Sequence, residues 1–224
     1  MHIGLIGGIG PAATEYYYRG LIKRHASTDT PLELTIVHAD VRELTRNLAN
    51  RDAKKQAEIF VRLVQRLAAA GARTAAITSM AGHFCIRELD AISPLPILDV
   101  IPKVNAAIKR RNLRTVGILG TRTVMETRLY GGVVSAEILL PEGEALEQVH
   151  NNYIEMAIAG RVTDSQRRTF FSIGQHLCQG QGAEAVILGG TDLFLAFDGQ
   201  DCGFPVIDCA EVHIEALYQE SSKA

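Results

Sequence analysis

The ten residues Ala183-Glu184-Ala185-Val186-Ile187-Leu188-Gly189-Gly190-Thr191-Asp192 carry the clearest structural signal in the chain. In this stretch a short apolar run, residues 185–188, ends in two glycines, a hydroxyl and a carboxylate. Such a run is typical of a parallel strand buried on both faces, with small and polar residues where the chain leaves the sheet. Because ligands of open α/β sheets bind outside the carboxyl ends of the strands, we expect a ligand site after residue 188.

The same pattern occurs earlier in the chain, in Gly71-Ala72-Arg73-Thr74-Ala75-Ala76-Ile77-Thr78-Ser79-Met80-Ala81-Gly82-His83. Aligning the two glycine–alanine pairs places Gly190 opposite Ser79, at an offset of 111 residues. Residues 116–127 likewise resemble 3–14 at an offset of 113, and residues 205–208 resemble 96–99 at an offset of 109. Three blocks in the same order, at nearly constant offset, predict two similar βα halves.

We therefore predict an α/β fold of two pseudo-symmetric lobes, each with a parallel sheet covered by helices. The expected first lobe is residues 1–100 with 209–224, and the second is residues 101–208, because a last helix from Ala210 to Gln219 should pack back on the first half. A cleft between such lobes is a natural ligand site, and we expect Ser79 and Gly190 to face each other across it. Earlier helices are expected at residues 12–24, 53–70 and 102–111.

Composition excludes several classes of protein. The chain has 224 residues, 47% of them hydrophobic, and a net charge of −2. It lacks the basic surplus typical of proteins that bind nucleic acid or anionic membranes, and no run of about 20 apolar residues could span a bilayer. The N-terminus does not resemble a signal peptide, and the four cysteines lack C-x-x-C spacing. We expect a cytoplasmic protein with free thiols and without metal or cofactor.

The turn Gly8-Ile9-Gly10-Pro11-Ala12-Ala13 has the glycine spacing of a dinucleotide-binding loop between a strand and a helix. That motif needs an acidic residue about 20 residues further on. Asp40 is the candidate but lies 27 residues after Ala13, and the repeat copy at 120–123 loses the later glycines. We therefore favour a small carboxylate, held by backbone N–H groups of Gly8, Ile9 and Gly10.

Further groups at the expected strand ends suit the same carboxylate. The turn at Met80 and Ala81 supplies backbone N–H groups, as its counterpart at Gly190 and Thr191 does. The hydroxyls of Thr121, Thr123 and Thr191 either bind the carboxylate or cap helices, and the sequence leaves both roles open.

Three titratable residues are candidates for the site. His83 follows Ser79 by four residues, which is one helical turn, and could move protons near neutral pH or be a hydrogen-bonded structural residue. The same alternatives apply to His213, which we expect at the start of the last helix. Asp192 could lie close to a substrate or cap a helix.

The remaining histidines and cysteines are assigned from their context. We expect His38, His150 and His176 at the surface. Cys85 and Cys209 should be buried as small apolar residues, whereas Cys202 lies in a polar loop where exposure is expected.

Together these segments resemble the aspartate/glutamate racemase superfamily along nearly the whole chain. The matching segments are Ile3–Pro11, Gly117–Thr121 with Thr123, Val186–Asp192, and Pro205–Asp208 with His213. The resemblance implies a cofactor-independent, homodimeric enzyme of two lobes, each of which gives one cysteine to a cleft. One thiolate removes the α-proton of an amino acid, and the other thiol returns a proton on the opposite face.

The sequence departs from the family at both catalytic positions. Ser79 stands where the first family cysteine would be, and Gly190 stands at the second. A serine hydroxyl is a weak base without an activating partner, and glycine has no acid–base group. The two-thiol mechanism is therefore not expected. Whether Cys85, Cys202 or Cys209 supplies a replacement thiol stays open.

The expected function is that of a racemase-like isomerase acting on a small amino acid or carboxylate. Catalysis would depend on Ser79 aided by His83 on one side, and on Asp192 or water on the other. Two alternatives remain: a catalytically silent carboxylate-binding protein, and a one-sided lyase or decarboxylase that protonates a single face.

Overall fold

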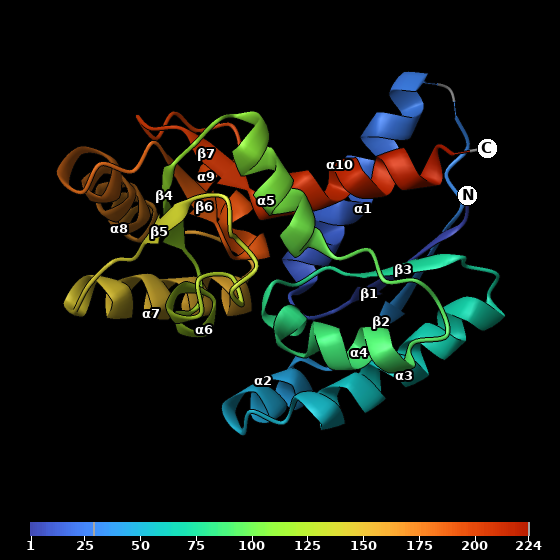
Figure 1. Ribbon diagram of the computed structural model, residues 1–224. Helices are drawn as coiled ribbons and strands as arrows, with labels where there is room; N and C mark the ends of the chain where they lie inside the picture. The colour runs from blue at the N-terminus through green and yellow to red at the C-terminus, as the bar shows by residue number, and fades with distance from the viewer. Residues whose placement is uncertain (29, 224) are drawn as a thin grey trace. The chain divides into compact units, whose positions relative to one another are not determined.

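The computed structural model describes residues 1–28 and 30–223, and Figure 1 shows it with its elements labelled. The chain divides into two compact units. Unit 1 comprises Met1–Asp99 with His213–Ala224, and unit 2 comprises Val100–Val212. None of the helices in these described ranges is long and apolar enough to cross a membrane.

Unit 1 is built on a parallel sheet with the strand order β2-β1-β3. Ile97 pairs in parallel with Ala75 of β3 and so extends the sheet beyond that strand. Figure 1 shows α1 and α3 on opposite faces of this sheet. Its elements are β1 (Ile3–Gly7), α1 (Pro11–Thr28), β2 (Leu34–His38), α2 (Val41–Ala49), α3 (Ala53–Ala69), β3 (Thr74–Ile77), the 3₁₀ helix η1 (Ala81–Cys85) and α4 (Ile86–Ile92).

Unit 2 contains a four-stranded parallel sheet with the order β5-β4-β6-β7. Its elements are α5 (Val100–Arg110), β4 (Thr115–Leu119), α6 (Arg122–Glu126), β5 (Glu137–Leu139), α7 (Glu144–Ala159), α8 (Asp164–Gln175), the π-helical turn η2 (His176–Gly180), β6 (Ala185–Leu188), the 3₁₀ turn η3 (Thr191–Leu193), α9 (Phe194–Phe197) and β7 (Val206–Asp208). The last helix, α10 (Cys209–Ser221), starts in unit 2 and continues into unit 1.

The two sheets have the same topology and the same register, which confirms the predicted pair of α/β halves. Ile3 pairs with Thr74 in unit 1, and Val116 pairs with Ala185 in unit 2. The bridge between Ala75 and Ile97 has its counterpart in the pairing of Val186 with Val206. Adding the sequence offsets to the residue numbers of a pair in unit 1 gives the corresponding pair in unit 2. The offset is 113 for β1, 111 for β3 and 109 for Ile97.

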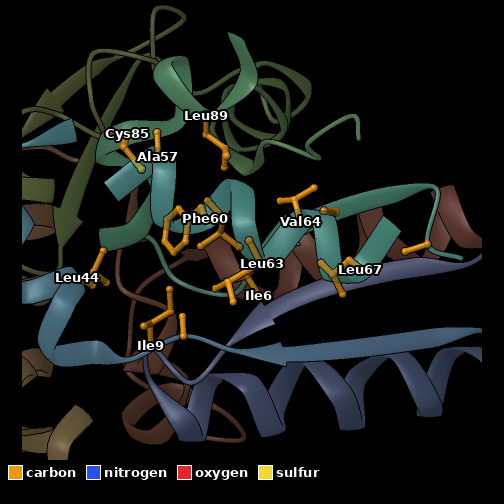
Figure 2. Packing of buried hydrophobic residues seen from close by; sticks show 14 residues of the cluster. Ile6, Ile9, Leu44, Ala57, Phe60, Leu63, Val64, Leu67, Cys85 and Leu89 are labelled. Atoms are coloured by element: carbon orange, nitrogen blue, oxygen red, sulfur yellow. The ribbon is translucent and has the colours of Figure 1, made fainter. Parts of the chain in front are cut away.

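Helix α3 anchors the sheet of unit 1 through one apolar face. Phe60, Leu63, Val64 and Leu67 recur at helical spacing, are buried, and pack in one cluster with Ile6 of β1 (Figure 2). The helix backs closely onto the strand, since a Cβ added at Gly4 would lie 2.7 Å from Cδ1 of Leu67. The cluster thus fixes the strands whose ends carry the candidate site.

Helices α3 and α5 lie within two residues of their predicted bounds at each end, whereas α1 and α10 extend beyond theirs for identifiable reasons. Helix α1 continues to Thr28, because its buried face continues from Leu21 to His25. Helix α10 starts at Cys209, where the Asp208 carboxylate accepts the N–H of Ala210 at 2.7 Å. His213 therefore lies inside this helix and not at its start, which corrects the expectation from the sequence.

Candidate functional site

Hydroxyl groups connect the end of β3 to the glycine turn after β1. The Thr78 hydroxyl donates to the carbonyl of Ile6 at 3.2 Å and lies 3.2 Å from the Thr14 hydroxyl. The Thr14 hydroxyl accepts the N–H of Gly8 at 2.9 Å. The Gly8 N–H is therefore used within the turn, while the turn itself is held against the chain that leads to Ser79.

The glycine at position 8 has a structural cause. Gly8 has a φ of +89°, and a Cβ there would lie 2.7 Å from the carbonyl oxygen of Ala39. Asp40, the residue that a dinucleotide site would need, caps α2 by accepting the Arg42 N–H at 2.8 Å. The hydrogen bonds from the Arg42 side chain and backbone lower the Asp40 pKa to about 2. Both residues thus have local structural roles that require no nucleotide.

His83 has one satisfied and one unsatisfied ring nitrogen. Its Nδ1 lies 2.7 Å from the carbonyl oxygen of Ser79, which can only accept, so Nδ1 carries the proton. The bond uses the backbone of Ser79 and leaves the serine hydroxyl out of it. Nε2 is buried, has no hydrogen-bond partner within residues 1–28 and 30–223, and lies 3.9 Å from Oδ1 of Asp99. The lone pair of the neutral imidazole is therefore on Nε2, the ring nitrogen near Asp99.

Burial keeps this imidazole neutral. It lowers the pKa of His83 below the ordinary 6.5, while Asp99 and the Ser79 carbonyl act in the opposite direction. At neutral pH the unprotonated form therefore dominates, and its Nε2 is able to accept a proton.

His213 is held by two partners in unit 1. Its Nε2 lies 2.9 Å from the carbonyl oxygen of Leu98, so this nitrogen donates, and Nδ1 accepts from the Tyr17 hydroxyl at 2.9 Å. The His213 and His83 rings meet edge to face with their centroids 6.0 Å apart. Because Leu98 precedes Asp99, His213 fixes the segment that brings the carboxylate to His83.

In unit 2 the residue equivalent to Ser79 is Gly190, and a side chain of helix α7 fills the space next to it. Gly190 is extended, with φ −131° and ψ 125°, so its backbone does not require glycine. A Cβ at this position would lie 2.7 Å from Cζ and 2.9 Å from the hydroxyl oxygen of Tyr153 on α7. The tip of the tyrosine ring thus occupies the space of the missing side chain.

Tyr153 is bonded to the two residues that follow Gly190. Its hydroxyl donates to Oδ2 of Asp192 at 3.1 Å and also meets the Thr191 hydroxyl. All three residues are buried. Asp192 does not cap the short helix η3, whose N-cap is Gly190. Its carboxylate instead accepts the hydrogen bond from Tyr153.

Thr121 caps α6, accepting the Val124 N–H at 3.4 Å, so one of the two roles left open for this threonine is observed. Thr123 is partly exposed on the same helix.

His150 is not simply a surface residue as expected: it is partly buried, and its Nδ1 accepts the N–H of Arg122 at 3.2 Å. His38 and His176 are exposed as expected.

The cysteines are poor replacements for the family thiols. Cys85 and Cys209 are buried, as predicted. Burial raises the pKa of Cys85 to about 12 and that of Cys209 well above its ordinary value, so both thiols stay protonated. Cys202 is partly exposed, and its Sγ lies 3.2 Å from the carbonyl oxygen of Phe204. Across the described residues, no group of three His, Cys, Asp or Glu side chains could hold a metal ion.

The structure brings Ser79, His83 and His213 together in unit 1, and Gly190, Thr191 and Asp192 together in unit 2. Whether the two groups face one cleft stays a prediction. The sequence pattern does not point to Asp99 or Tyr153 as site residues. Asp99 is the last residue of the repeated block 96–99, which was a usable signal. Tyr153 lies 37 residues before Gly190 on a separate helix, and no motif marks it.

Comparisons with known proteins agree with this architecture. The model of the Asp/Glu/Hydantoin racemase family matches residues 6–217. A Yersinia pestis protein assigned as an Asp/Glu racemase is 25% identical, with full coverage of both chains and a TM-score of 0.85. An aspartate racemase homologue from Pyrococcus horikoshii is 26% identical over 99% of each chain, with a TM-score of 0.82. A Picrophilus torridus aspartate racemase, 17% identical over 100% of this chain and 96% of its own, shares the fold at a TM-score of 0.78.

Proposed function

The chain belongs to the Asp/Glu/hydantoin racemase family, and on this premise we propose that it is an isomerase that moves the α-proton of a small amino acid or related carboxylate without using two thiols. His83 is proposed as the proton-transfer group of unit 1. Its buried, unprotonated Nε2 is the observation that carries the proposal.

An imidazole suits this role better than the serine that stands at the family cysteine position. A general base works best when its pKa lies near the working pH, and His83 titrates on the acid side of neutrality. Ser79 lies at the end of β3, and no hydrogen bond joins its hydroxyl to His83 in the described structure. We assign the Ser79 hydroxyl to substrate binding, not to proton abstraction.

The remaining site residues are proposed to bind the substrate. The α-carboxylate would meet backbone N–H groups and hydroxyls at strand ends, as racemase chemistry requires a firmly held carboxylate beside the reacting carbon. The proposed binding residues are Ile9, Gly10, Met80, Ala81, Thr121, Thr123 and Thr191. Gly8 and His213, whose own polar groups are already hydrogen-bonded, would hold the neighbouring segments in place.

Exchange of the α-proton in D₂O, followed by ¹H NMR, tests the proposal directly. Both enantiomers of aspartate and glutamate are incubated with wild type, His83→Gln and the exposed-site control His176→Gln. We expect His83→Gln to lower the exchange rate by about 10² to 10⁴-fold, and the control to match wild type.

Three results would contradict the proposal. A wild-type protein that binds these acids but exchanges no proton would be a binding protein, and one that converts them to products of different mass would be a lyase. Unchanged exchange in His83→Gln would remove His83 from the mechanism.

A further inference from the structure

Two of the four cysteines lie at the same edge of the sheet in unit 2. Cys178 belongs to η2, which leads into β6, and Cys202 belongs to the loop that leads into β7. The two strands are parallel neighbours, with Val186 paired to Val206, so both leading segments enter the sheet at its amino edge. The Val186 N–H donates to the carbonyl of Pro205 at 2.9 Å and holds the two segments side by side. This edge is opposite the strand ends that carry the candidate site.

An aromatic contact holds the Cys202 loop against α8, the helix that continues into η2. A Cβ added at Gly174 of α8 would lie 2.9 Å from Cε2 of Phe204, so the ring packs directly on the helix backbone. Cys178 follows Gly174 by four residues, about one helical turn. The Cys202 Sγ lies 3.2 Å from the carbonyl oxygen of Phe204, which places the sulfur beside the same contact.

The electrostatics of the two thiols agree with this placement. Burial raises the pKa of Cys178, and the Cys202 thiol raises it further, as a second group that becomes negative does at short range. The pKa values of Cys85 and Cys209 are raised by burial and by a neighbouring carboxylate instead. Cys178 and Cys202 are also partly exposed, whereas Cys85 and Cys209 are buried. A reagent in solution therefore reaches one pair of neighbouring thiols.

We propose that Cys178 and Cys202 are a redox modification site, at which a small-molecule disulfide such as oxidised glutathione converts the two thiols into an intramolecular disulfide. The bond joins η2 to the loop before β7, across 24 positions of sequence. It forms at the edge opposite Gly190 and Asp192, so its effect is on the stability of unit 2 and not on proton transfer. The inference is independent of the proposed function.

The step balances in atoms and electrons. The thiolate of one cysteine attacks the S–S bond of the reagent, forms a mixed disulfide and releases one glutathione thiolate. The thiolate of the other cysteine then attacks the protein sulfur of the mixed disulfide, forms the protein disulfide and releases the second glutathione. The two protein thiols lose two protons and two electrons. The reagent takes up both electrons as its S–S bond breaks, and the two protons restore its thiols.

The test starts from the fully reduced protein and oxidised glutathione. The wild type should lose two of its four thiols, counted with a chromogenic thiol reagent in denaturant, and retain no glutathione by intact mass. Peptide mapping without reduction should find one linked pair, which contains Cys178 and Cys202. Cys178→Ser and Cys202→Ser each leave a single reactive thiol and should carry one glutathione as a mixed disulfide. Cys85→Ala is the control and should form the disulfide as the wild type does.

Thermal unfolding gives a second readout. The disulfide constrains the unfolded chain, so the oxidised wild type should have an unfolding midpoint about 5–15 °C above that of the reduced protein. Glutathione-treated Cys202→Ser should show no such rise. A wild type that keeps four thiols, or that carries two glutathiones without a linked peptide, would overturn the proposal, as would a link that contains Cys85 or Cys209. These readouts need no substrate, so none of them bears on the proposed function.

Discussion

Nε2 of His83 lies 3.9 Å from Oδ1 of Asp99 and has no hydrogen-bond partner among the residues described. The two residues come from different segments of unit 1, the 3₁₀ helix after β3 and the end of the block that extends the sheet. The carboxylate opposes the effect of burial on the imidazole, and so sets how far the pKa of His83 falls below 6.5.

Asp99→Asn should therefore lower the pKa of His83 further, because it removes the charge that favours the imidazolium. The α-proton exchange rate of wild type should rise with pH through the lowered pKa of His83, on the acid side of 6.5, and in Asp99→Asn this rise should move to lower pH. An NMR titration of the His83 ring gives the pKa directly. Asp90→Asn, on the exposed surface of α4, is the control, and a shift toward higher pH in Asp99→Asn would contradict the assignment.

The same pKa has a consequence for stability. A histidine whose folded pKa is lowered binds fewer protons in the folded than in the unfolded state, so its contribution destabilises the fold as the pH falls below about 6.5. His83→Gln should flatten this part of the stability profile. Urea unfolding between pH 5 and pH 7 measures it, and an equally steep profile in the variant would show that other groups cause the loss.

The buried bond between Tyr17 and His213 should be important for the stability of unit 1. Tyr17→Phe removes the donor to Nδ1 of His213 without changing the packed ring, and should cost about 1–3 kcal/mol in the free energy of unfolding. Tyr18→Phe, the neighbouring exposed position, should cost less than about 0.5 kcal/mol. Equal costs in the two variants would mean that the bond contributes nothing measurable.

The sheets are predictable from the sequence because their signal is local and repeated. Apolar runs that end in small and polar residues mark β3 and β6, and the repeat offsets relate register pairs such as Val186 with Val206 to their counterparts in unit 1. The helix ends are less predictable, since the start of α10 depends on the carboxylate of Asp208, which a composition pattern does not reveal.

The candidate site is predictable only for residues that adjoin a strand end. Ser79, His83, Thr191 and Asp192 follow β3 or β6 directly, so position along the chain is enough to find them. Tyr153 reaches its place by packing of α7 against η3, a tertiary contact between segments without a shared motif. From the sequence alone, Gly190 suggests that a side chain is absent at this strand end. In the structure, the Tyr153 ring fills the space that such a side chain would occupy.

Substitution of Gly190 should be destabilising for a steric reason and not a conformational one. Its φ of −131° suits any residue, but a Cβ would collide with the Tyr153 ring. Gly190→Ala should cost about 1–3 kcal/mol in wild type and much less in the Tyr153→Ala background, where the ring is absent. Urea unfolding of the four proteins completes a double-mutant cycle. Additive costs would show that the two residues do not compete for space.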